Sequence, residues 1–377
     1  MIVTKSNAFD FHKETLFVKK VFVCALLFLT ILLTFGELYP RKSQKIDLST
    51  GAGISKMLRY DDAQVYLFGE THRCTEYQQF RNVLFKYLVK EKGVRVFVEE
   101  AGYATTFLEN ETVQGRLSFS DWLDRCTSSK EDYELYQWIA DWNSGREDAD
   151  KISIIGIDIT DNIGNMQMLC QYLLKTCNFT GADVQTQRLL TAIRKQNPFS
   201  SLQLQTFQDE FLPQLIELYQ TKPEQLENVL GTQAMHLERA LLGWQEALEQ
   251  QRLRGKAEQL GDSDDVYREN CLYENFMREY QERPDTKYYG EFGAAHVLMS
   301  DYSGKIYRVQ NSFVTRLAEE GSPLNGKLTV IDGGLTFEIG DLGESDTNKV
   351  TLYNTASAKP PVQDMNKFYM DGFAQDA

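Results

Sequence analysis

Short apolar segments alternate with longer amphipathic segments through most of the chain. Four of the short segments are rich in β-branched or aromatic side chains, which is typical of buried strands in a parallel sheet. These segments are Val65–Phe68, Val94–Val98, Ile152–Ile157 and Lys287–Phe292. The stretches between them have apolar residues at helical spacing. This alternation predicts an α/β fold with a mostly parallel central sheet flanked by helices.

The stretch after the first predicted strand carries the start and end signals of a helix. Thr75 and Gln78 have the spacing of a capping box, and Gly93 stands where such a helix ends. Between them an apolar face recurs at helical spacing, formed by Tyr77, Phe80, Leu84, Tyr87 and Leu88. A strand, a helix and a second strand in succession predict a right-handed crossover.

The second half of the chain has a different pattern. Residues from about 183 to 281 are helical in pattern and rich in Gln, Leu and Glu, which predicts a helical insertion or cap. The segment Lys327–Glu338 predicts a pair of strands. We therefore expect a single α/β domain over 57–355, with a linker at 37–56 and a loose, polar C-terminal tail at 356–377.

An uncharged apolar segment, Val21–Phe35, lies near the N-terminus, directly after Lys19 and Lys20. A positive flank before about fifteen apolar residues is typical of a signal peptide or signal anchor, here at 21–36. A buried core helix is the alternative. No clear cleavage site follows, which favours an uncleaved transmembrane anchor with residues 1–20 on the cytoplasmic side. The body is then expected to be membrane-anchored or secreted, on the extracytoplasmic side.

The composition limits the kinds of partner. The chain has 377 residues and a formal net charge of -14, so nucleic acid is not expected as a partner because phosphate binding needs basic patches. The cysteines outside the leader show no metal-ligand spacing, and we interpret them as structural or as forming one or two disulfides. They are Cys74, Cys126, Cys170, Cys177 and Cys271.

Each of the predicted strands ends at ionisable residues. In open α/β sheets, ligands bind beyond the carboxyl ends of the strands, so these side chains are expected to share one crevice. They are Glu70 and His72 after the first strand, Glu99 and Glu100 after the second, Asp158 after the third and His296 after the fourth. The alternative for each acid is a solvated cap of the following helix.

Two histidines make the prediction of a shared crevice more specific. His72 and His296 each stand three residues after a glycine, just past a strand, whereas His236 lies in a helical pattern and is interpreted as packing. A histidine in a crevice can act as a general base near neutral pH. No Gly-x-Ser-x-Gly elbow occurs, and Cys74 has no special context. Water activated by His72 is therefore favoured over a serine or cysteine nucleophile.

A metal ion is the competing interpretation of the same residues. Glu70, His72, Glu99 and His296 are residue types that hold several divalent ions, although their spacing is not a recognised zinc signature. No cofactor is expected on the first interpretation, and a divalent metal is possible on the second.

Two arginines are candidates for contacts with the crevice. Arg81 lies on the first predicted helix, nine residues after His72, and Arg268 lies in the helix before the fourth strand. Such arginines can bind a substrate oxyanion or order the acids. A surface salt bridge is the alternative for either one.

The order of these segments resembles the erythromycin esterase family and the wider group that includes the haem-uptake and Tiki proteins. The resemblance runs from about Tyr60 to Met299, and no single motif in it is specific. It is carried by GETH at His72, FRNVLFKYLV with Arg81, a strand ending at Glu99, YELYQWIADWN, GIDI at Asp158, YRENCLYENF with Arg268 and Asn275, and GAAHV at His296.

The resemblance implies a metal-independent carboxylic ester hydrolase that acts on a small ester or lactone. In the esterases the first-motif histidine, matched by His72, is the general base, and residues matched by Glu70 and Glu99 support it. The residues matched by Arg268 and His296 complete the site, while Arg81, Glu100, Asp158 and Asn275 are candidates for substrate binding. Two departures stand out: a single residue separates Glu70 from His72, and Gly293 replaces the first histidine of the last motif.

Two other functions remain open from the sequence. One is a metal-dependent peptidase or other metallohydrolase of the Tiki type, which would use the same residues as ligands. The other is a non-enzymatic protein that binds haem or another small ligand, for which Tyr288, Tyr289 and Phe292 are aromatic candidates.

Overall fold

The fold was analysed in a computed structural model of the chain. The structure describes residues 44–58, 62–72, 74–122, 129–159, 162–260, 266–299, 302–303, 308–309, 311–332, 349–354 and 367–371. All of them belong to one structural unit that begins at Gln44.

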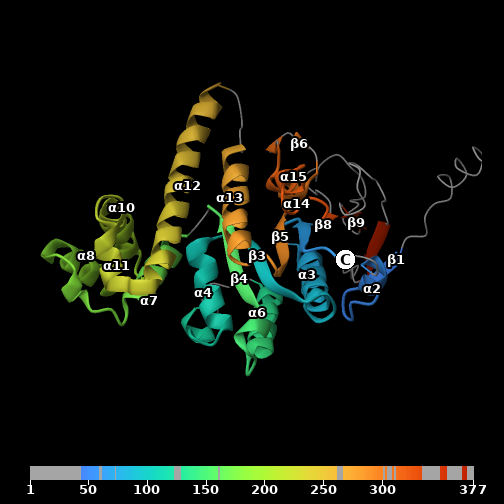
Figure 1. Ribbon diagram of the computed structural model, residues 1–377, viewed down its shortest axis with the longest axis horizontal. Helices are drawn as coiled ribbons and strands as arrows, with labels where there is room; N and C mark the ends of the chain where they lie inside the picture. Colours follow the sequence, from blue (N-terminus) through green and yellow to red (C-terminus); the bar gives the residue numbers. More distant parts are fainter. Residues whose placement is uncertain are drawn as a thin grey trace, which may run out of the picture. The chain divides into compact units, whose positions relative to one another are not determined.

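An eight-stranded sheet with the order β1-β10-β9-β8-β2-β5-β3-β4 forms the centre of this unit (Figure 1). Its core is β8-β2-β5-β3-β4, in which every neighbouring pair is parallel. These strands are β2 (Val65–Glu70), β3 (Val94–Gly102), β4 (Ser153–Asp158), β5 (Lys287–Gly293) and β8 (Leu328–Asp332). The predicted α/β class with a mostly parallel sheet is confirmed, and each predicted strand is present.

Strands that follow each other in the sequence are not always neighbours in the sheet. β2 and β3 are joined by a helix, but β5 lies between them and pairs with both. β5 comes almost two hundred residues after β3, so the middle of the sheet forms only when distant parts of the chain meet. The carboxyl ends of β2, β5, β3 and β4 consequently lie side by side.

Helices cover both faces of the sheet. On β2, Tyr66 and Phe68 belong to one apolar core, and Val65 and Leu67 belong to the other, as the alternation of side chains along a strand requires. The first core includes residues of helices α3, α4, α6 and α7, and the second includes residues of α13, α14 and α15. The bounds are α3 (Thr75–Tyr87), α4 (Tyr103–Val113), α6 (Lys130–Asn143), α7 (Ile163–Leu174), α13 (Val266–Glu282), α14 (Ala294–Val297) and α15 (Phe313–Ala318).

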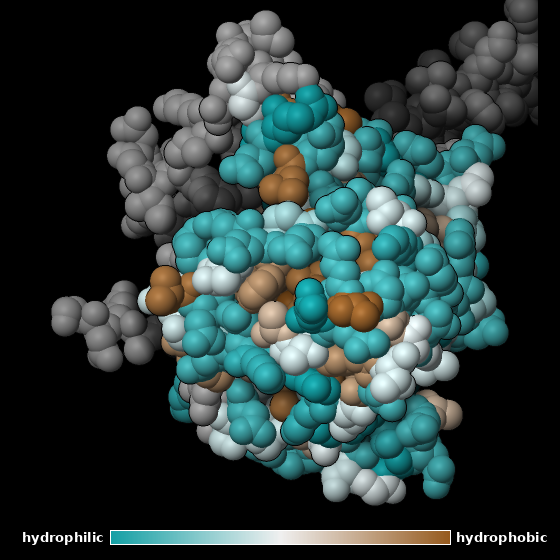
Figure 2. Space-filling model, turned by 90° about the vertical axis from the view of Figure 1, so that its left-hand side faces the viewer, coloured by the Kyte–Doolittle hydropathy of each residue, from teal (hydrophilic) through white to brown (hydrophobic). Residues whose placement is uncertain are grey.

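The predicted helical insertion is present as a run of helices between β4 and β5. Its members are α8 (Val184–Arg194), α9 (Ser201–Thr206), α10 (Leu212–Thr221), α11 (Pro223–Leu230) and α12 (Ala234–Leu260), followed by α13. Figure 2 shows the side of the molecule on which these helices lie, and it is mostly hydrophilic with separate apolar patches. The insertion also leaves single apolar side chains exposed, such as Leu202 at 76%.

The capping-box prediction for α3 is wrong. The helix begins at Thr75, the residue before it is Cys74, and no side chain caps its first turn. The predicted end is confirmed, because a π-helical turn at Leu88–Lys92 follows α3 and ends at Gly93, whose φ of 77° suits glycine.

The edges of the predicted domain also need correction. The predicted linker contains β1 (Gln44–Asp47) and α2 (Ile54–Met57), and part of the predicted loose tail forms β10 (Lys367–Asp371). β1 and β10 pair in parallel, and the buried Ile46 and Ile54 anchor this edge to the core. β10 also pairs with β9, which precedes it in the sequence, but β1 has no partner near it, so local pattern could not reveal the β1–β10 pairing.

The predicted pair of strands around residue 333 is found only in its first member. β8 pairs antiparallel with β9 (Lys349–Asn354), and residues 333–348 lie outside the described residues. The remaining described strands are β6 (Tyr302–Ser303) and β7 (Arg308–Val309), which form a separate antiparallel pair.

No helix among the described residues has both the length and the apolar character needed to cross a membrane, so the structure gives no support to the predicted transmembrane anchor. The apolar segment itself, Val21–Phe35, lies outside those residues. The four described cysteines, Cys74, Cys170, Cys177 and Cys271, are all free thiols. Cys126 lies outside the described residues, so no disulfide joins the cysteines that the structure places.

Candidate active site

His72 and Glu70 form the most exposed part of the polar residues at the carboxyl ends of the strands. Glu70 is the last residue of β2, and its Oε1 lies 2.5 Å from Nδ1 of His72. The His72 side chain is 56% exposed, whereas that of Glu70 is only 9% exposed. The buried carboxylate therefore fixes the ring through Nδ1 and leaves Nε2 as the nitrogen that can meet a substrate or water.

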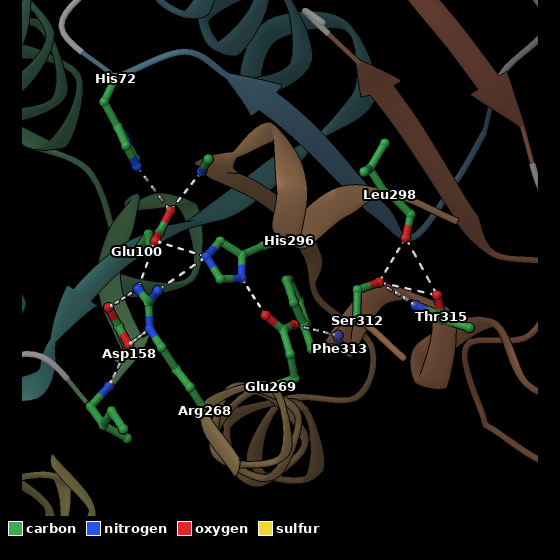
Figure 3. A network of polar contacts seen from close by, with 12 residues as sticks. His72, Glu100, Asp158, Arg268, Glu269, His296, Leu298, Ser312, Phe313 and Thr315 are labelled. Carbon is green, nitrogen blue, oxygen red and sulfur yellow. Dashed lines mark hydrogen bonds and ion pairs between the residues drawn. The ribbon is translucent and has the colours of Figure 1, made fainter. Parts of the chain in front are cut away.

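Glu100, near the end of β3, lies between His72 and His296 (Figure 3). Its Oε2 is 3.9 Å from Nε2 of His72, and its Oε1 is 3.3 Å from Nε2 of His296. The two imidazoles thus flank one carboxylate, so the structure brings His72 and His296 together at the strand ends. Burial alone raises the pKa of Glu100, but His296, Arg268 and the Gly293 N–H hold it well below its usual range.

Arg268 joins the ends of β3, β4 and β5 from the neighbouring helix α13, and its contact after β5 is from Nη1 to Nε2 of His296 at 3.1 Å. Its Nε and Nη2 bind the two carboxylate oxygens of Asp158 at 2.9 and 2.6 Å, and Nη2 also lies 2.7 Å from Glu100. The planar guanidinium suits such paired contacts. Its side chain is only 13% exposed, so it neutralises carboxylates that water does not reach.

His296 is held between Glu100 and a second carboxylate, Glu269, which is fully buried on α13. Glu269 binds Nδ1 of His296 and also accepts the backbone N–H of Phe313 at 2.8 Å. Burial favours the neutral ring, but the two carboxylates outweigh it and raise the pKa of His296 to about 10. The His296 side chain is only 4% exposed, and Nη1 of Arg268 lies 3.1 Å from its Nε2, so the ring is poorly placed to take a proton from a water molecule.

His72 differs from His296 chiefly in its exposure, because its side chain is 56% exposed and that of His296 only 4%. The hydrogen bond to Glu70 is the largest influence and raises the pKa of His72, burial opposes it, and the charge of Glu100 adds to the increase. The ring still faces solvent and carries one carboxylate partner in hydrogen-bond range, so it can exchange its proton with bound water. Of the two histidines at this crevice, His72 alone has a nitrogen in position to accept a proton.

Gly293 makes room for His72. A Cβ atom at this position would lie 3.0 Å from Nε2 and 3.3 Å from Cε1 of His72, and 3.4 Å from Oε2 of Glu100. The Gly293 backbone N–H also donates to Glu100 at 2.6 Å. The glycine at the end of β5 therefore shapes the floor under the imidazole.

Gly293→Ala is expected to displace the imidazole of His72 and so to lower kcat/KM for hydrolysis by about ten- to a hundred-fold. Displacement of a catalytic group by about 1 Å can reduce the rate by this much. Steady-state kinetics on an ester substrate measure the effect. Gly255→Ala, at a helical position with open space around it, is the matched control and should change little. Equal activities of the two variants would show that the close approach is unimportant.

Glu99 and Arg81 lie in a second polar cluster, on the opposite face of the sheet. Neighbouring residues of a strand point to opposite faces, so Glu99 cannot accompany Glu100. The phenol of Tyr136 donates to Glu99 at 2.9 Å, and Arg81 binds Asp132 at 2.7 Å and Glu291 at 3.1 Å. The structure thus does not bring Glu99 or Arg81 to the exposed ring of His72.

The second cluster contains a pair of buried carboxyl groups, Glu99 and Glu109. Burial is the main cause that raises the pKa of Glu99 to about 7, and burial together with the neighbouring Glu99 raises the pKa of Glu109 well above its usual range. Ionising both carboxyl groups costs much free energy, because two negative charges close together in the protein interior repel each other strongly.

Glu109→Gln is therefore expected to stabilise the protein by about 1–3 kcal/mol at pH 8 and to have little effect near pH 4.5. A carboxyl whose pKa is raised on folding loses stability as pH rises from its unfolded to its folded pKa. The neutral amide removes that loss. Urea unfolding at both pH values measures the effect, with the exposed Glu227→Gln as control. A variant that is less stable at pH 8 than wild type would contradict the assignment.

The remaining candidates have structural contacts. Asn275 donates from Nδ2 to the carbonyl of Ile157 at 3.0 Å and so ties α13 to the edge strand β4. His236 packs against Phe107, with ring centroids 4.7 Å apart, as interpreted from its helical pattern.

Several polar partners were not identified from the sequence. Glu269 stands directly after Arg268, and Tyr136 lies in the YELYQWIADWN segment, so both were within reach of the motifs. Glu291 lies inside an apolar strand, and no motif in the neighbouring sequence marks it as a partner of other polar residues. The residues that sequence reasoning missed are Glu269, Glu109, Tyr136, Asp132 and Glu291.

The described residues do not fit a metal ion. No group of three or more His, Cys, Asp or Glu side chains among them is arranged to hold one. The donors that the sequence offered are engaged elsewhere: Glu70 with His72, Glu99 with Tyr136, and His296 with Glu269. Tyr288, Tyr289 and Phe292 are buried in the two cores, so they present no aromatic surface for haem.

Comparison with solved structures places this arrangement in a known fold. The erythromycin esterase EreC, solved in an open conformation, matches with a TM-score of 0.50 and 15% identity over 74% of this chain and 72% of its own. A Bacillus cereus protein matches with a TM-score of 0.51 and 18% identity over 80% of this chain and 73% of its own. The chain has an erythromycin esterase-like fold. No family model matches the sequence, and no curated protein does.

The erythromycin esterase-like fold explains why the polar residues gather at one edge. Parallel strands end together, and the helix that precedes β5 packs beside β4, so Arg268 reaches both Asp158 and Glu100. The short helix α14 begins directly after Gly293 and turns His296 back toward Glu100. The resemblance in motif order is thus matched by a resemblance in fold, at an identity low enough that substrate and chemistry need separate arguments.

Proposed function

We propose that the protein is a hydrolase of erythromycin esterase type that cleaves a small ester or lactone with water activated by His72. The observation that carries the proposal is the pairing of a half-exposed His72 with the buried Glu70 at the crevice formed by the strand ends. Histidine ordered by a carboxylate is a common form of general base. The fold of an esterase supports the same class of reaction.

The proposed reaction uses one histidine as base and then as acid. Nδ1–H of His72 donates to Glu70, and Nε2 takes a proton from a water molecule as its oxygen attacks the carbonyl carbon. The imidazolium then returns that proton to the leaving alkoxide as the ester C–O bond breaks. The products are a carboxylic acid and an alcohol, or a hydroxy acid from a lactone. Glu70 stabilises the intermediate positive charge on the ring.

The surrounding charges have a supporting role in this scheme. Arg268 and the imidazolium of His296 balance Glu100 and Asp158, so Glu100 stays ionised beside His72. A carboxylate at 3.9 Å from Nε2 adds to the stabilisation of a protonated His72 during the reaction. Arg268, His296, Glu269 and Asp158 are positioning residues in this proposal.

The pH dependence of kcat/KM tests the partnership of His72 and Glu70. Only the neutral ring accepts a proton, and Glu70 raises the pKa of His72, so activity should fall as pH decreases through a pKa above the ordinary value near 6.5. In Glu70→Gln the ring loses its main anionic partner, its pKa falls, and the acid limb should move to lower pH. The maximal rate should also drop because the ring is less well ordered.

The control for this profile is Glu134→Gln, an exposed carboxylate on α6 whose side chain is 53% exposed. Its profile should match that of the wild type. An acid limb that stays in place in Glu70→Gln would separate Glu70 from the titrating base.

The class of reaction is tested with purified full-length protein and a panel of aryl esters, alkyl esters and lactones of different ring size. We expect hydrolysis of at least one compound, at the same rate with and without a chelator. Metal analysis of the same sample separates this function from a metallohydrolase. Hydrolysis that disappears on chelation and returns with a divalent ion would overturn the metal-independent mechanism.

A further inference from the structure

A basic cleft lies at the end of the sheet opposite the proposed active site. It has a volume of about 370 Å³ and is lined by residues at the starts of β3 and β4, at the C-terminal end of α4 and in the segment before β5. Its charged lining residues are Arg95, Arg116, Lys151, Arg283 and Asp148. Such an excess of cations is unexpected in a chain with a net charge of -14.

The partners of these cations leave positive charge in the cleft. Arg95 donates to the backbone carbonyls of Val89 and Val94 at 3.1 and 2.8 Å and lies 5.5 Å from the Trp142 ring. No ion pair with a carboxylate is found for Arg95 within the described part of the chain. Backbone carbonyls satisfy its hydrogen bonds but do not cancel its charge.

The other cations are paired in ways that an incoming anion can share. Lys151 binds Asp148 at 2.7 Å, but that aspartate is 97% exposed, and ion pairs of this kind are weak. Arg116 uses Nε and Nη2 for Glu111, which leaves Nη1 out of that pair.

Arg283 completes the set from the end of α13. It binds Ser153 through Nη1 at 2.7 Å and Glu279 through Nη2 at 3.1 Å. Glu279 also pairs with Arg239, so one carboxylate is divided between two guanidinium groups. The positive charge around the cleft thus exceeds the negative charge that faces it.

A second cavity continues from the cleft along β4. It has a volume of about 240 Å³, and the two cavities share Asn110, Arg116, Ser153 and Arg283 in their walls. The second cavity is lined by the aromatic rings of Tyr103, Phe107 and His236, together with three arginines and three glutamates whose charges balance, so the excess positive charge lies in the first cavity. His236 accepts or donates a hydrogen bond with Tyr103 at 2.7 Å, and burial lowers its pKa, so it is a neutral ring at pH 7.

We propose that the joined cavities bind a small organic anion, with a flat ring against Phe107 and His236 and an anionic oxygen group among Arg95, Arg116, Lys151 and Arg283. Guanidinium groups bind phosphate and carboxylate oxygens through paired hydrogen bonds, and aromatic side chains stack on planar rings. The anionic group can be phosphoryl or carboxylate, since both have this chemistry. The site goes beyond the proposed hydrolase function and lies on the far side of β3 and β4 from it.

A purely structural role of the cations makes a different prediction. Helices of an α/β fold end at this edge of the sheet, and basic side chains commonly neutralise such ends. The bond from Arg95 to Val89, in the π-helical turn that follows α3, is of this kind. A structural role predicts a change in stability without selective binding, whereas the proposal predicts binding that depends on the same residues in the folded protein.

The test is calorimetric titration of the full-length protein at low salt with adenosine monophosphate, adenosine, inorganic phosphate and benzoate. We expect adenosine monophosphate to bind more tightly than adenosine or inorganic phosphate alone, and to weaken as salt is added. If benzoate binds more tightly than the phosphate compounds, the same proposal holds with a carboxylate as the anionic group. No measurable binding of any probe at 10 mM, an order-of-magnitude limit for weak binding, would overturn it.

Single substitutions distinguish binding in the cleft from a general effect of the protein's charge. Arg95→Gln and Lys151→Gln should each weaken the anionic probe about ten-fold, the scale of one lost charge-assisted hydrogen bond. His236→Ala should weaken the ring-bearing probe but not inorganic phosphate. Arg252→Gln, an exposed arginine on α12 paired with Glu249, is the control and should change nothing. Equal weakening by Arg252→Gln, or none in both cleft variants when circular dichroism shows them folded, would overturn the proposal.

Discussion

His72→Ala is expected to lower kcat/KM for ester hydrolysis by about 10²–10⁴-fold, the usual contribution of a general base. His72 is the histidine at the strand ends whose ring is exposed and whose Nε2 can accept a proton, because His296 is buried between Glu100, Glu269 and Arg268. The measurement is steady-state hydrolysis of the best ester or lactone found in the panel. Activity equal to wild type would remove His72 from the mechanism.

A loss of folding must be distinguished from a loss of chemistry in that experiment. His72 is half-exposed, so its removal deletes little packing, although it leaves Glu70 without its ring partner. We therefore expect the denaturation midpoint to change only slightly. Tyr219→Ala is the control, because it removes another partly buried polar ring, on α10 and away from the strand ends. It should keep wild-type kcat/KM if the effect of His72 is chemical.

The strands were predictable because buried parallel strands are short, apolar and separated by helical pattern. The end of a strand was also predictable, which is why Glu70, Asp158 and His296 could be placed near one another before the fold was known. The position of β5 between β2 and β3 was not, because it depends on contacts between segments far apart in the chain. The same reason hid β1 and β10, which pair across most of the sequence.

The division of Glu99 from Glu100 shows where sequence reasoning about the site stops. Both residues follow an apolar run and either could face the crevice, but side-chain alternation sends them to opposite faces of the sheet. A bulge between Glu99 and Gly102 adds an irregularity that no simple pattern predicts. The structure places Glu100 beside both histidines and Glu99 beside Tyr136. Which face of the sheet a strand-end side chain points to can thus be known only once the strands are paired in three dimensions.

Arg268→Ala is expected to lower the free energy of unfolding by about 3–5 kcal/mol at pH 7, because it leaves buried carboxylates without their cation. Arg268 is the shared partner of Asp158 and Glu100, both nearly excluded from water. As pH falls, the orphaned carboxylates can take up protons and lose their charge, so the deficit relative to wild type should shrink below about pH 5. Urea unfolding at pH 7 and pH 4 measures the stability deficit above and below this pH.

Arg268→Lys separates charge from geometry in the same experiment. Lysine restores one positive charge but cannot reproduce the paired contacts of the guanidinium with Asp158, so it should recover only part of the stability. Arg252→Gln is the control for loss of an exposed arginine and should cost less than about 1 kcal/mol. If Arg268→Ala is as stable as that control at pH 7, the carboxylates are not held by Arg268. His72, Glu100 and His296 would then have to keep their positions without the central cation that the present arrangement requires.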